Sequence, residues 1–208
     1  MNEQNQPQCI AFEGVRCLAS GNLLQVARKV KEALDRGAPN SILIFDEITG
    51  EPIEVDFRGT TADVLARLEK TIAAAWPVPA PEAEPVPAEP RGPGRPKLGV
   101  VAREVTLFPR HWEWLAGQPG GASVALRKLV EEARRANAKR DALRKAQESA
   151  QVFLSAMAGN LPDYEEATRA LFAGDSARFD EHTESWPVDI RTHARKIAAH
   201  AFPEAARP

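Results

Sequence analysis

The sequence contains few cysteines, no long apolar run and no recognisable secretory leader. Only Cys9 and Cys17 occur among its 208 residues, and two thiols fit a reducing cytoplasm better than a disulfide scaffold. We expect free, buried thiols, with a redox pair across a hairpin as the alternative. No stretch approaches the roughly 18 consecutive apolar residues that span a bilayer. Residues 1–7 also lack the basic and apolar segments of a signal peptide, so we predict a cytoplasmic protein without membrane association.

The usual signatures of enzyme active sites are also missing. The chain has no glycine-rich phosphate loop, no nucleophile elbow and no histidine pair at metal-binding spacing. Two groups are candidates for cation or metal binding: the acids Asp46, Glu47, Glu54 and Asp56, and the histidines His182, His193 and His200. Strand-end acids are usually only solvated, and these histidines lack the tight spacing of a metal site. We predict a non-enzymatic protein with no catalytic residue, metal or cofactor.

Positive charge is concentrated in one part of the chain. The formal net charge is −2. Thirteen basic and five acidic residues lie between Arg91 and Lys145, which gives this segment +8 and leaves −10 for the rest. Such segregation is expected where one module binds a polyanion such as DNA. The alternative is the solvated, charged face of a long helix.

The first 75 residues have the pattern of a small α+β domain. Two helices are expected, over 22–36 with Ser20 as the cap, and over 62–75 with Thr60 or Thr61 as the cap. Four strands are expected: 10–12 and 15–18 as a hairpin, the apolar run 41–46 as the central strand, and 52–57 with one solvated face. We predict a small mixed, mostly antiparallel β-sheet domain with two helices, which binds an unknown partner or effector.

Residues 76–98 are predicted to form a proline-rich linker that ends in a basic arm. Eight prolines between Trp76 and Pro96 favour an extended, polyproline-like spacer. Its end, residues 94–97, resembles an AT-hook, whose thin extended backbone fits the minor groove of A·T-rich DNA. This resemblance assigns contacts with the minor groove or with phosphates to Arg91, Arg95, Pro96 and Lys97. A basic linker end without this role is the alternative.

The segment 99–136 resembles a ribbon-helix-helix DNA-binding module. Its parts are an alternating run over 103–108, a short helix over 110–117 opened by Pro109, a glycine-containing turn and a longer helix capped by Ser123. In that family two subunits pair one strand each into a ribbon that lies in the major groove. The resemblance turns Val105 and Leu107 inward, and it turns Glu104 and Thr106 towards the base edges.

The same resemblance assigns roles to the two helices. The short helix would bury Trp112 and Leu115. Four apolar residues of the longer helix would pack on the partner subunit: Leu126, Leu129, Val130 and Ala133. The N–H groups of residues 122–124 would bind a phosphate at the helix N-terminus. Contacts with the DNA backbone are assigned to Arg103, Arg110, Ser123, Arg127 and Lys128. A plain helical hairpin with a capping strand is the alternative.

Residues 137–208 are predicted to be helical. No Gly or Pro interrupts 124–158, and apolar residues recur at intervals of seven, which favours one long helix with a seam for self-association. Further helices are expected over 162–172, over 175–185 and from Pro187 onward. Four residues of the last helix are expected to face inward: Ile190, Ala194, Ile197 and Ala198.

The chain as a whole resembles an uncharacterised bacterial family, domain of unknown function 2239. The resemblance rests on residues 11–14, 42–46, 94–107, 110–115 and 170–175, and it implies a bacterial, cytoplasmic origin. The residues themselves predict a homodimeric DNA-binding protein, either a transcriptional regulator or an antitoxin-like repressor. The alternative is a protein-interaction adaptor whose basic helix binds an acidic partner.

Overall fold

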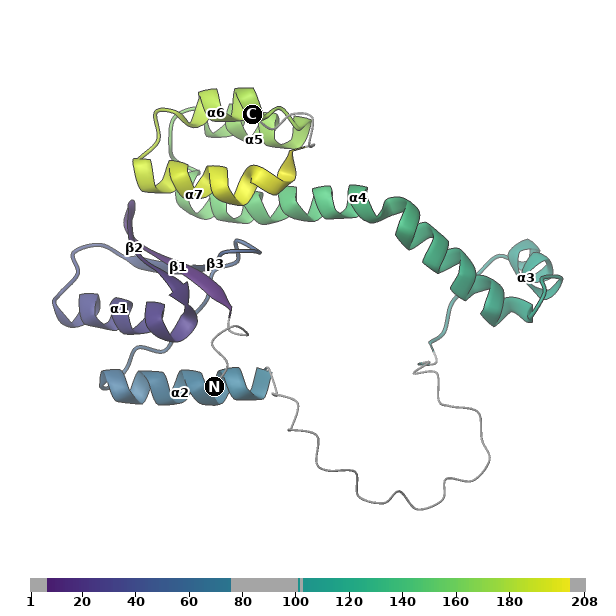
Figure 1. Ribbon diagram of the computed structural model, residues 1–208, viewed down its shortest axis with the longest axis horizontal. Coiled ribbons are helices and arrows are strands. Elements are labelled where there is room, and N and C mark those ends of the chain that lie inside the picture. Colours follow the sequence, from purple (N-terminus) through teal and green to yellow (C-terminus); the bar gives the residue numbers. More distant parts are fainter. Residues whose placement is uncertain (1–6, 76–100, 102, 203–208) are drawn as a thin grey trace, which may run out of the picture. The chain divides into compact units, whose positions relative to one another are not determined.

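The computed structural model describes residues 7–75, 101 and 103–202 (Figure 1). The chain divides into two compact units: residues 1–77 together with 139–208, and residues 78–138. The expected linker and its AT-hook-like arm, with Arg91, Arg95, Pro96 and Lys97, lie outside the described residues.

The first unit is α+β and contains a three-stranded sheet. β1 (Gln8–Glu13) is the middle strand, between β2 (Arg16–Asn22) and β3 (Ile42–Asp46). β1 and β2 form the expected hairpin. Gly14 at its turn has a φ of 58°, which glycine adopts without strain.

The sheet differs from the sequence-based prediction in three respects. It is wholly antiparallel rather than mixed. β1 rather than the run 41–46 is central, and the interior of β1 is buried on both faces. Residues 52–57 form no strand, and a single bridge joins Phe45 to Pro52. Two backbone hydrogen bonds flank this bridge, from the Asp46 N–H to the Glu51 carbonyl at 2.9 Å and from the Ile53 N–H to the Ile44 carbonyl at 2.7 Å.

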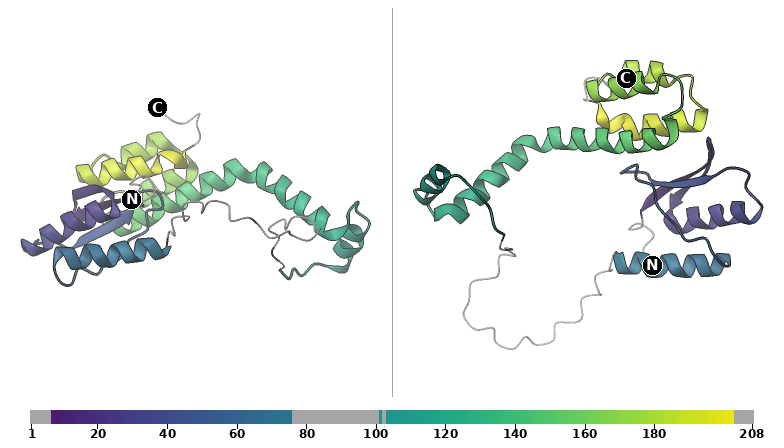
Figure 2. Two further views of the ribbon diagram at one scale, coloured as in Figure 1. Left: turned by 60° about the horizontal axis from the view of Figure 1, so that its bottom comes forward. Right: turned by 180° about the vertical axis from the view of Figure 1, so that it is seen from behind.

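Two helices cover one face of the sheet (Figures 1 and 2). They are α1 (Leu23–Asp35) and α2 (Thr61–Ala75), each within one residue of its expected range. Cys9, Ala11 and Ile44 point to this side and share a buried cluster with apolar residues of both helices.

The caps of these helices are local side-chain contacts. Asn22, not Ser20, caps α1, because its side-chain oxygen accepts a hydrogen bond from the Gln25 N–H at 2.9 Å. Thr60 precedes α2 as expected, and its Oγ1 accepts from the Asp63 N–H at 3.3 Å. Asp63 in turn accepts from the Thr60 N–H at 2.9 Å, so the two residues form a reciprocal capping box.

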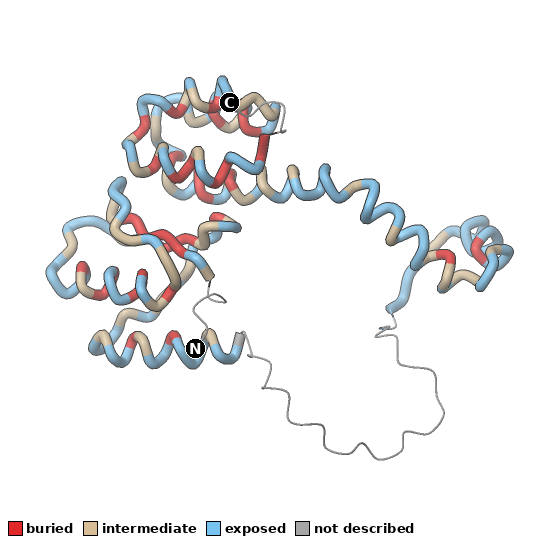
Figure 3. Tube along the Cα trace, viewed as in Figure 1, coloured by how far each residue is buried: buried red, intermediate tan, exposed pale blue. Residues whose placement is uncertain are grey.

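The C-terminal helices cover the other face of the sheet (Figure 3). The last turns of α4 (Gly121–Ala158) and α7 (Val188–Ala198) lie next to the sheet. α5 (Tyr164–Ala173) and α6 (Ser176–Thr183) lie beyond them (Figure 1), and the short 3-10 helix η2 (Ala199–Ala201) follows α7. Ile10, Phe12 and Phe45 point to this side and join Phe153 and Leu154 of α4 in one buried cluster. Successive residues of a strand face opposite sides, so β1 supplies both cores. Residues 1–75 and 137–208, which are expected from the sequence to be separate regions, pack into one unit.

The described part of the second unit contains α3 (Pro109–Ala116) and the first turns of α4. Pro109 stands at the start of α3, as expected. The uninterrupted helix predicted for 124–158 is confirmed, but α4 already begins at Gly121. Ser123 therefore lies in the first turn of the helix and is not its cap.

The predicted strand 103–108 is not formed in the single chain. A ladder needs a second strand, and none lies beside this segment among the described residues. Its last residue, Phe108, keeps an extended backbone with φ −64° and ψ 150°. The segment is therefore extended at its end but unpaired.

Candidate nucleic-acid interface

The first turns of α4 carry an apolar stripe. Four residues three or four positions apart share one face of the helix and form this stripe: Leu126, Leu129, Val130 and Ala133. Leu129 and Val130 are 43% and 63% exposed, and Figure 3 shows these turns as largely exposed. Within the described part of this unit, only Leu115 and Ala125 are buried. An apolar face with this spacing normally packs against another element, and the single chain provides none among its described residues.

Basic residues lie on the opposite side of the same turns. Four cations form this basic face: Arg127, Lys128, Arg134 and Arg135. Glu131 pairs with two of them, because its Oε1 accepts from Arg134 at 3.0 Å and from Arg135 at 3.3 Å. Arg127 and Lys128 have no ion-pair partner among the described residues, and they border an open depression together with Glu131. They are the cations of the basic face that can meet an external anion without breaking an existing pair.

α3 exposes most of its aromatic rings. Leu115 is buried as expected, whereas Trp112 and Trp114 are 42% and 54% exposed. The prediction that Trp112 is buried is wrong for the single chain, because the described part of this unit is too small to cover it. The guanidinium carbon of Arg110 lies 4.8 Å from the centre of the Phe108 ring. This cation–π contact holds a positive charge beside the start of α3.

The segment before α3 presents both polar and apolar side chains. Arg103, Glu104 and Thr106 are exposed, which leaves them accessible to a ligand. Leu107 is half-buried, but Val105 is 54% exposed. The predicted inward position of Val105 requires the paired strand of a second subunit, which the single chain does not contain.

The structure brings only some of the predicted DNA contacts together. Ser123, Arg127 and Lys128 lie within two turns of α4. Arg110 lies on α3, and Arg103 lies in the extended segment before it. Sequence reasoning did not identify Phe108 as the partner of Arg110. An aromatic residue two positions before an arginine is the only local signal for that contact.

The structure also locates the cysteines. Cys9 is buried, but Cys17 is exposed, so the expectation of two buried thiols is only half met; both thiols are free. Cys9 pairs with Gly21 and Cys17 with Phe12 across the hairpin, which keeps the two thiols apart. Burial raises the pKa of Cys9 to about 12, so this side chain remains a protonated thiol at neutral pH.

The described residues contain neither a group of potential metal ligands nor a helix that could span a membrane. Among residues 7–75, 101 and 103–202, no three His, Cys, Asp or Glu side chains are grouped so that they could hold a metal ion. No helix in that part of the chain is both long and apolar enough to cross a membrane.

A comparison with family models gives the relationship of the chain to known proteins. The family described as "Uncharacterized protein conserved in bacteria (DUF2239)" matches residues 8–198. The chain belongs to this family. The matched range includes residues of both compact units. No curated protein and no solved structure matches the chain. The description of DUF2239 states no activity, so the function has to be inferred from the geometry.

Proposed function

We propose that this DUF2239 protein is a non-enzymatic, homodimeric DNA-binding protein of the cytoplasm, acting as a transcriptional regulator or an antitoxin-like repressor. One observation carries the proposal: the first turns of α4 combine an exposed apolar stripe with a basic face on the opposite side. The apolar stripe suits contact with a second copy of the chain, and the basic face suits contact with a polyanion.

The apolar stripe supports dimerisation energetically. Full burial of an aliphatic side chain the size of Leu129 or Val130 is worth about 1.5–3 kcal/mol, and a twofold interface buries each residue twice. With Leu115 and Ala125 as the only buried residues in its described part, the unit has too small a core to be stable alone. A second chain supplies both a cover for the stripe and a strand to pair with 103–108.

The proposed dimer presents 103–108 as a two-stranded ribbon. Such a ribbon fits the major groove, where Thr106 can bond with any base edge and Glu104 can accept a hydrogen bond from a cytosine amine. Arg103 and Arg110 lie at the two ends of this segment, where phosphates flank the groove. We assign base contacts to Glu104 and Thr106 and backbone contacts to the two arginines.

The start of α4 provides further backbone contacts. N–H groups in the first turn of a helix have no intrahelical partner and attract phosphate. Ser123 lies in this turn of α4, and we therefore assign it a contact with a DNA phosphate. Arg127 and Lys128 follow within the next turn and have no ion pair among the described residues. The AT-hook-like arm at 94–97 is assigned to the minor groove, in line with its sequence.

Fluorescence anisotropy with labelled A·T-rich and G·C-rich duplexes tests the proposal in rising salt. We expect Arg127→Ala/Lys128→Ala to lower affinity for both duplexes roughly tenfold and to reduce the salt slope by about 1 to 2, since phosphate contacts are sequence-independent. The control is Arg28→Ala/Lys29→Ala, an adjacent and exposed pair of the same residue types on α1, which should bind as the wild type does. Failure of correctly folded wild type to bind either duplex at low salt contradicts the proposal.

A protein-interaction adaptor is the second candidate. It is favoured by Glu131, which pairs with both Arg134 and Arg135 and gives this side of the helix mixed charge. An acidic protein partner can exploit such a mixed pattern, whereas a phosphate backbone is repelled by the glutamate. Competition with heparin separates the two candidates. If unlabelled duplex and heparin of matched charge displace a labelled duplex equally well, the protein does not prefer DNA, and the adaptor is favoured.

A further inference from the structure

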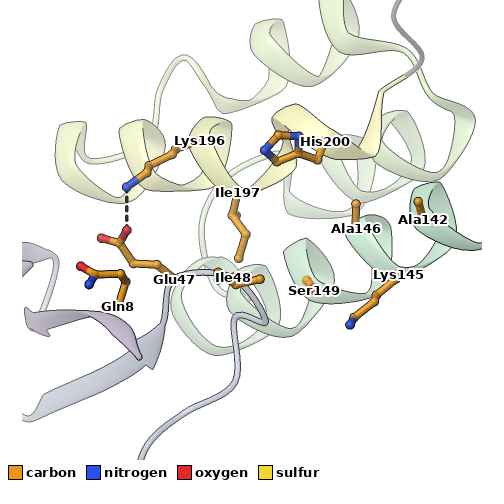
Figure 4. A pocket seen from close by; sticks show the side chains of 10 residues that line it. All are labelled: Gln8, Glu47, Ile48, Ala142, Lys145, Ala146, Ser149, Lys196, Ile197 and His200. Carbon is orange, nitrogen blue, oxygen red and sulfur yellow. Dashed lines mark hydrogen bonds and ion pairs between the residues drawn. The ribbon is translucent and has the colours of Figure 1, made fainter. Parts of the chain in front are cut away.

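A cleft of about 600 Å³ lies within the first unit (Figure 4). Its walls come from the turn after β3, from α4 and from the end of α7 with η2. Cavities of roughly 300–1,000 Å³ are typical of sites for small organic ligands. The volume of the cleft therefore suits a small molecule rather than a single ion.

The inner wall of the cleft is apolar. Ile48, Ala146 and Ile197 line it, and Figure 4 shows them between α4, α7 and the turn after β3. Ile48 is 73% exposed and is therefore accessible to a ligand in the cleft. These side chains provide a surface for the apolar body of a ligand.

The turn that carries Ile48 is held in place by its own hydrogen bonds. The Oδ1 atom of Asp46 accepts from the N–H groups of Ile48 and Thr49, both at 2.8 Å. Gly50, with a φ of 68°, packs so closely on α4 that a Cβ atom would overlap the Ser149 carbonyl oxygen. The wall is therefore preformed, which lowers the entropic cost of binding.

The acid at the cleft is already neutralised. Glu47 is only 13% exposed at its side chain and pairs with Lys196 at 2.7 Å; it also accepts from the Ser20 hydroxyl at 3.0 Å. Burial alone raises the pKa of Glu47, but the hydrogen bonds from Lys196 and Ser20, together with the positive charge of Lys196, hold the pKa below its ordinary value. Glu47 thus stays a carboxylate whose charge is balanced within the protein.

Uncompensated donors remain at the mouth of the cleft. Lys145 and His200 line it and have no ion-pair partner among the described residues. Lys196 gives one of its three N–H donors to Glu47 and keeps two. The cleft thus combines an apolar wall with donors that favour a negative group.

We propose that this cleft binds a small organic carboxylate with an apolar body. The apolar body lies against Ile48 and Ile197, and the carboxylate pairs with Lys145, which has no ion-pair partner among the described residues, while Lys196 and His200 add donors elsewhere along the lining. The proposal goes beyond DNA binding and does not depend on it, because all lining residues belong to the first unit.

Isothermal titration calorimetry of the full chain with 2-naphthoate tests the proposal, with neutral 2-naphthamide as the matched ligand. We expect saturable one-to-one binding of the carboxylate, about tenfold tighter than that of the amide, because charge-assisted hydrogen bonds are lost in the amide. Lys145→Gln should weaken carboxylate binding roughly threefold, because it removes one solvent-exposed charge pair and such pairs contribute little. Lys139→Gln removes the same charge from α4 outside the cleft and should have no effect.

Two more variants locate the binding site. Ala142→Trp places a large ring at an exposed position of the cleft wall and should abolish binding. Leu129→Asp/Val130→Asp removes the apolar stripe of the other unit and should leave binding intact. The proposal is overturned by equal affinity for acid and amide, by equal effects of the two lysine variants, by absence of saturable binding, or by binding that only the stripe variant removes.

Discussion

His193, on α7, packs against aromatic rings from the sheet and from α4. It is 3% exposed, with its ring centre 4.5 Å from that of Phe153 and 5.9 Å from that of Phe12. Burial lowers its pKa from 6.5 to about 4, an effect that Lys196 increases and Glu47 opposes. Its Nε2 atom is buried and has no hydrogen-bond partner among the described residues. The folded protein therefore holds this side chain as a neutral imidazole at neutral pH.

This burial makes the stability of the protein depend on pH. The unfolded chain protonates His193 near pH 6.5 and the folded protein only near pH 4, so between these values the unfolded state binds more protons. The contribution of neutral His193 to the free energy of unfolding is complete above pH 6.5, the pKa in the unfolded chain, and is lost as the pH falls toward 4. We expect the free energy of unfolding to decrease by up to about 3 kcal/mol over this interval, at ~1.4 kcal/mol per pKa unit.

Urea unfolding of wild type and His193→Leu at about pH 7.5 and about pH 4.5 measures this effect. Other groups also titrate in this range, so the informative quantity is the difference between the two proteins. The variant should lose less stability than the wild type on acidification. His200→Leu replaces an exposed histidine and should follow the wild type. Equal losses in wild type and His193→Leu would show that His193 is not held neutral by the fold.

For single residues, the sequence predicts which side chains are buried better than it predicts which other side chains they contact. The spacing in the last helix places Ile190, Ala194, Ile197 and Ala198 inward, and all four are buried. His193 shares that face, but nothing in the local sequence indicates its contact with Phe12 at the other end of the chain. For Trp112 the prediction is wrong: the ribbon-helix-helix resemblance implies a buried side chain, whereas the described part of its unit has almost no core to cover it.

Among the elements, α4 contains most of the residues that we propose to contact DNA or a second chain. It extends over 38 residues, and its first turns divide into the apolar stripe and the basic face. If the stripe forms the dimer interface, charges placed on it disrupt the dimer even though the basic face is unchanged. DNA affinity should then fall because the ribbon over 103–108 needs two chains.

We expect Leu129→Asp/Val130→Asp to raise the dissociation constant of the dimer roughly 30-fold or more, the effect of losing about 2 kcal/mol at the centre of an interface. Sedimentation equilibrium over a range of concentrations measures the change. Val152→Asp is the control, since Val152 is a 38% exposed aliphatic residue of the same helix in the first unit. A wild type that remains monomeric at all concentrations excludes the dimer.

Helices are predicted more successfully than strands in this chain, for a physical reason. The ranges of α1, α2 and α4 follow closely from local spacing and from the absence of interior glycine and proline, which act within a few residues. Strands exist only where a partner lies beside them. Residues 52–57 alternate as a strand does yet remain outside the sheet, and β1 becomes the central strand because β2 and β3 pair with its two edges.

The same distinction applies to the candidate interface. The basic residues Arg127 and Lys128 are predicted from local composition, and the structure places them on one exposed side of α4. The state of 103–108 is not predictable from one chain, because its pairing depends on a second molecule. The cleft beside Glu47 is not predictable either, because its walls come from residues far apart in the sequence.

For the molecule as a whole, the first unit is assembled from both ends of the chain. Phe12 and Phe45 from the sheet contact Phe153 from α4, with ring centres 5.7 Å and 5.2 Å apart. Polar contacts join the same parts, since the Cys17 N–H donates to Asp189 at 2.8 Å. The second unit, 78–138, is inserted between the two parts in sequence.

This arrangement predicts that residues 1–77 do not fold on their own. Without the C-terminal helices, Ile10, Phe12 and Phe45 lose their cover, at about 1.5–3 kcal/mol for each side chain. Their sum is comparable to the total stability of an ordinary domain, roughly 5–15 kcal/mol. The fragment should give a poorly dispersed amide NMR spectrum, and addition of residues 139–208 should restore dispersion.

A chain in which a flexible linker replaces 78–138 keeps both halves of the core and should fold, because the shared core rather than the inserted segment stabilises the sheet. A well-dispersed spectrum from 1–77 alone would instead mean that the cluster with α1 and α2 suffices.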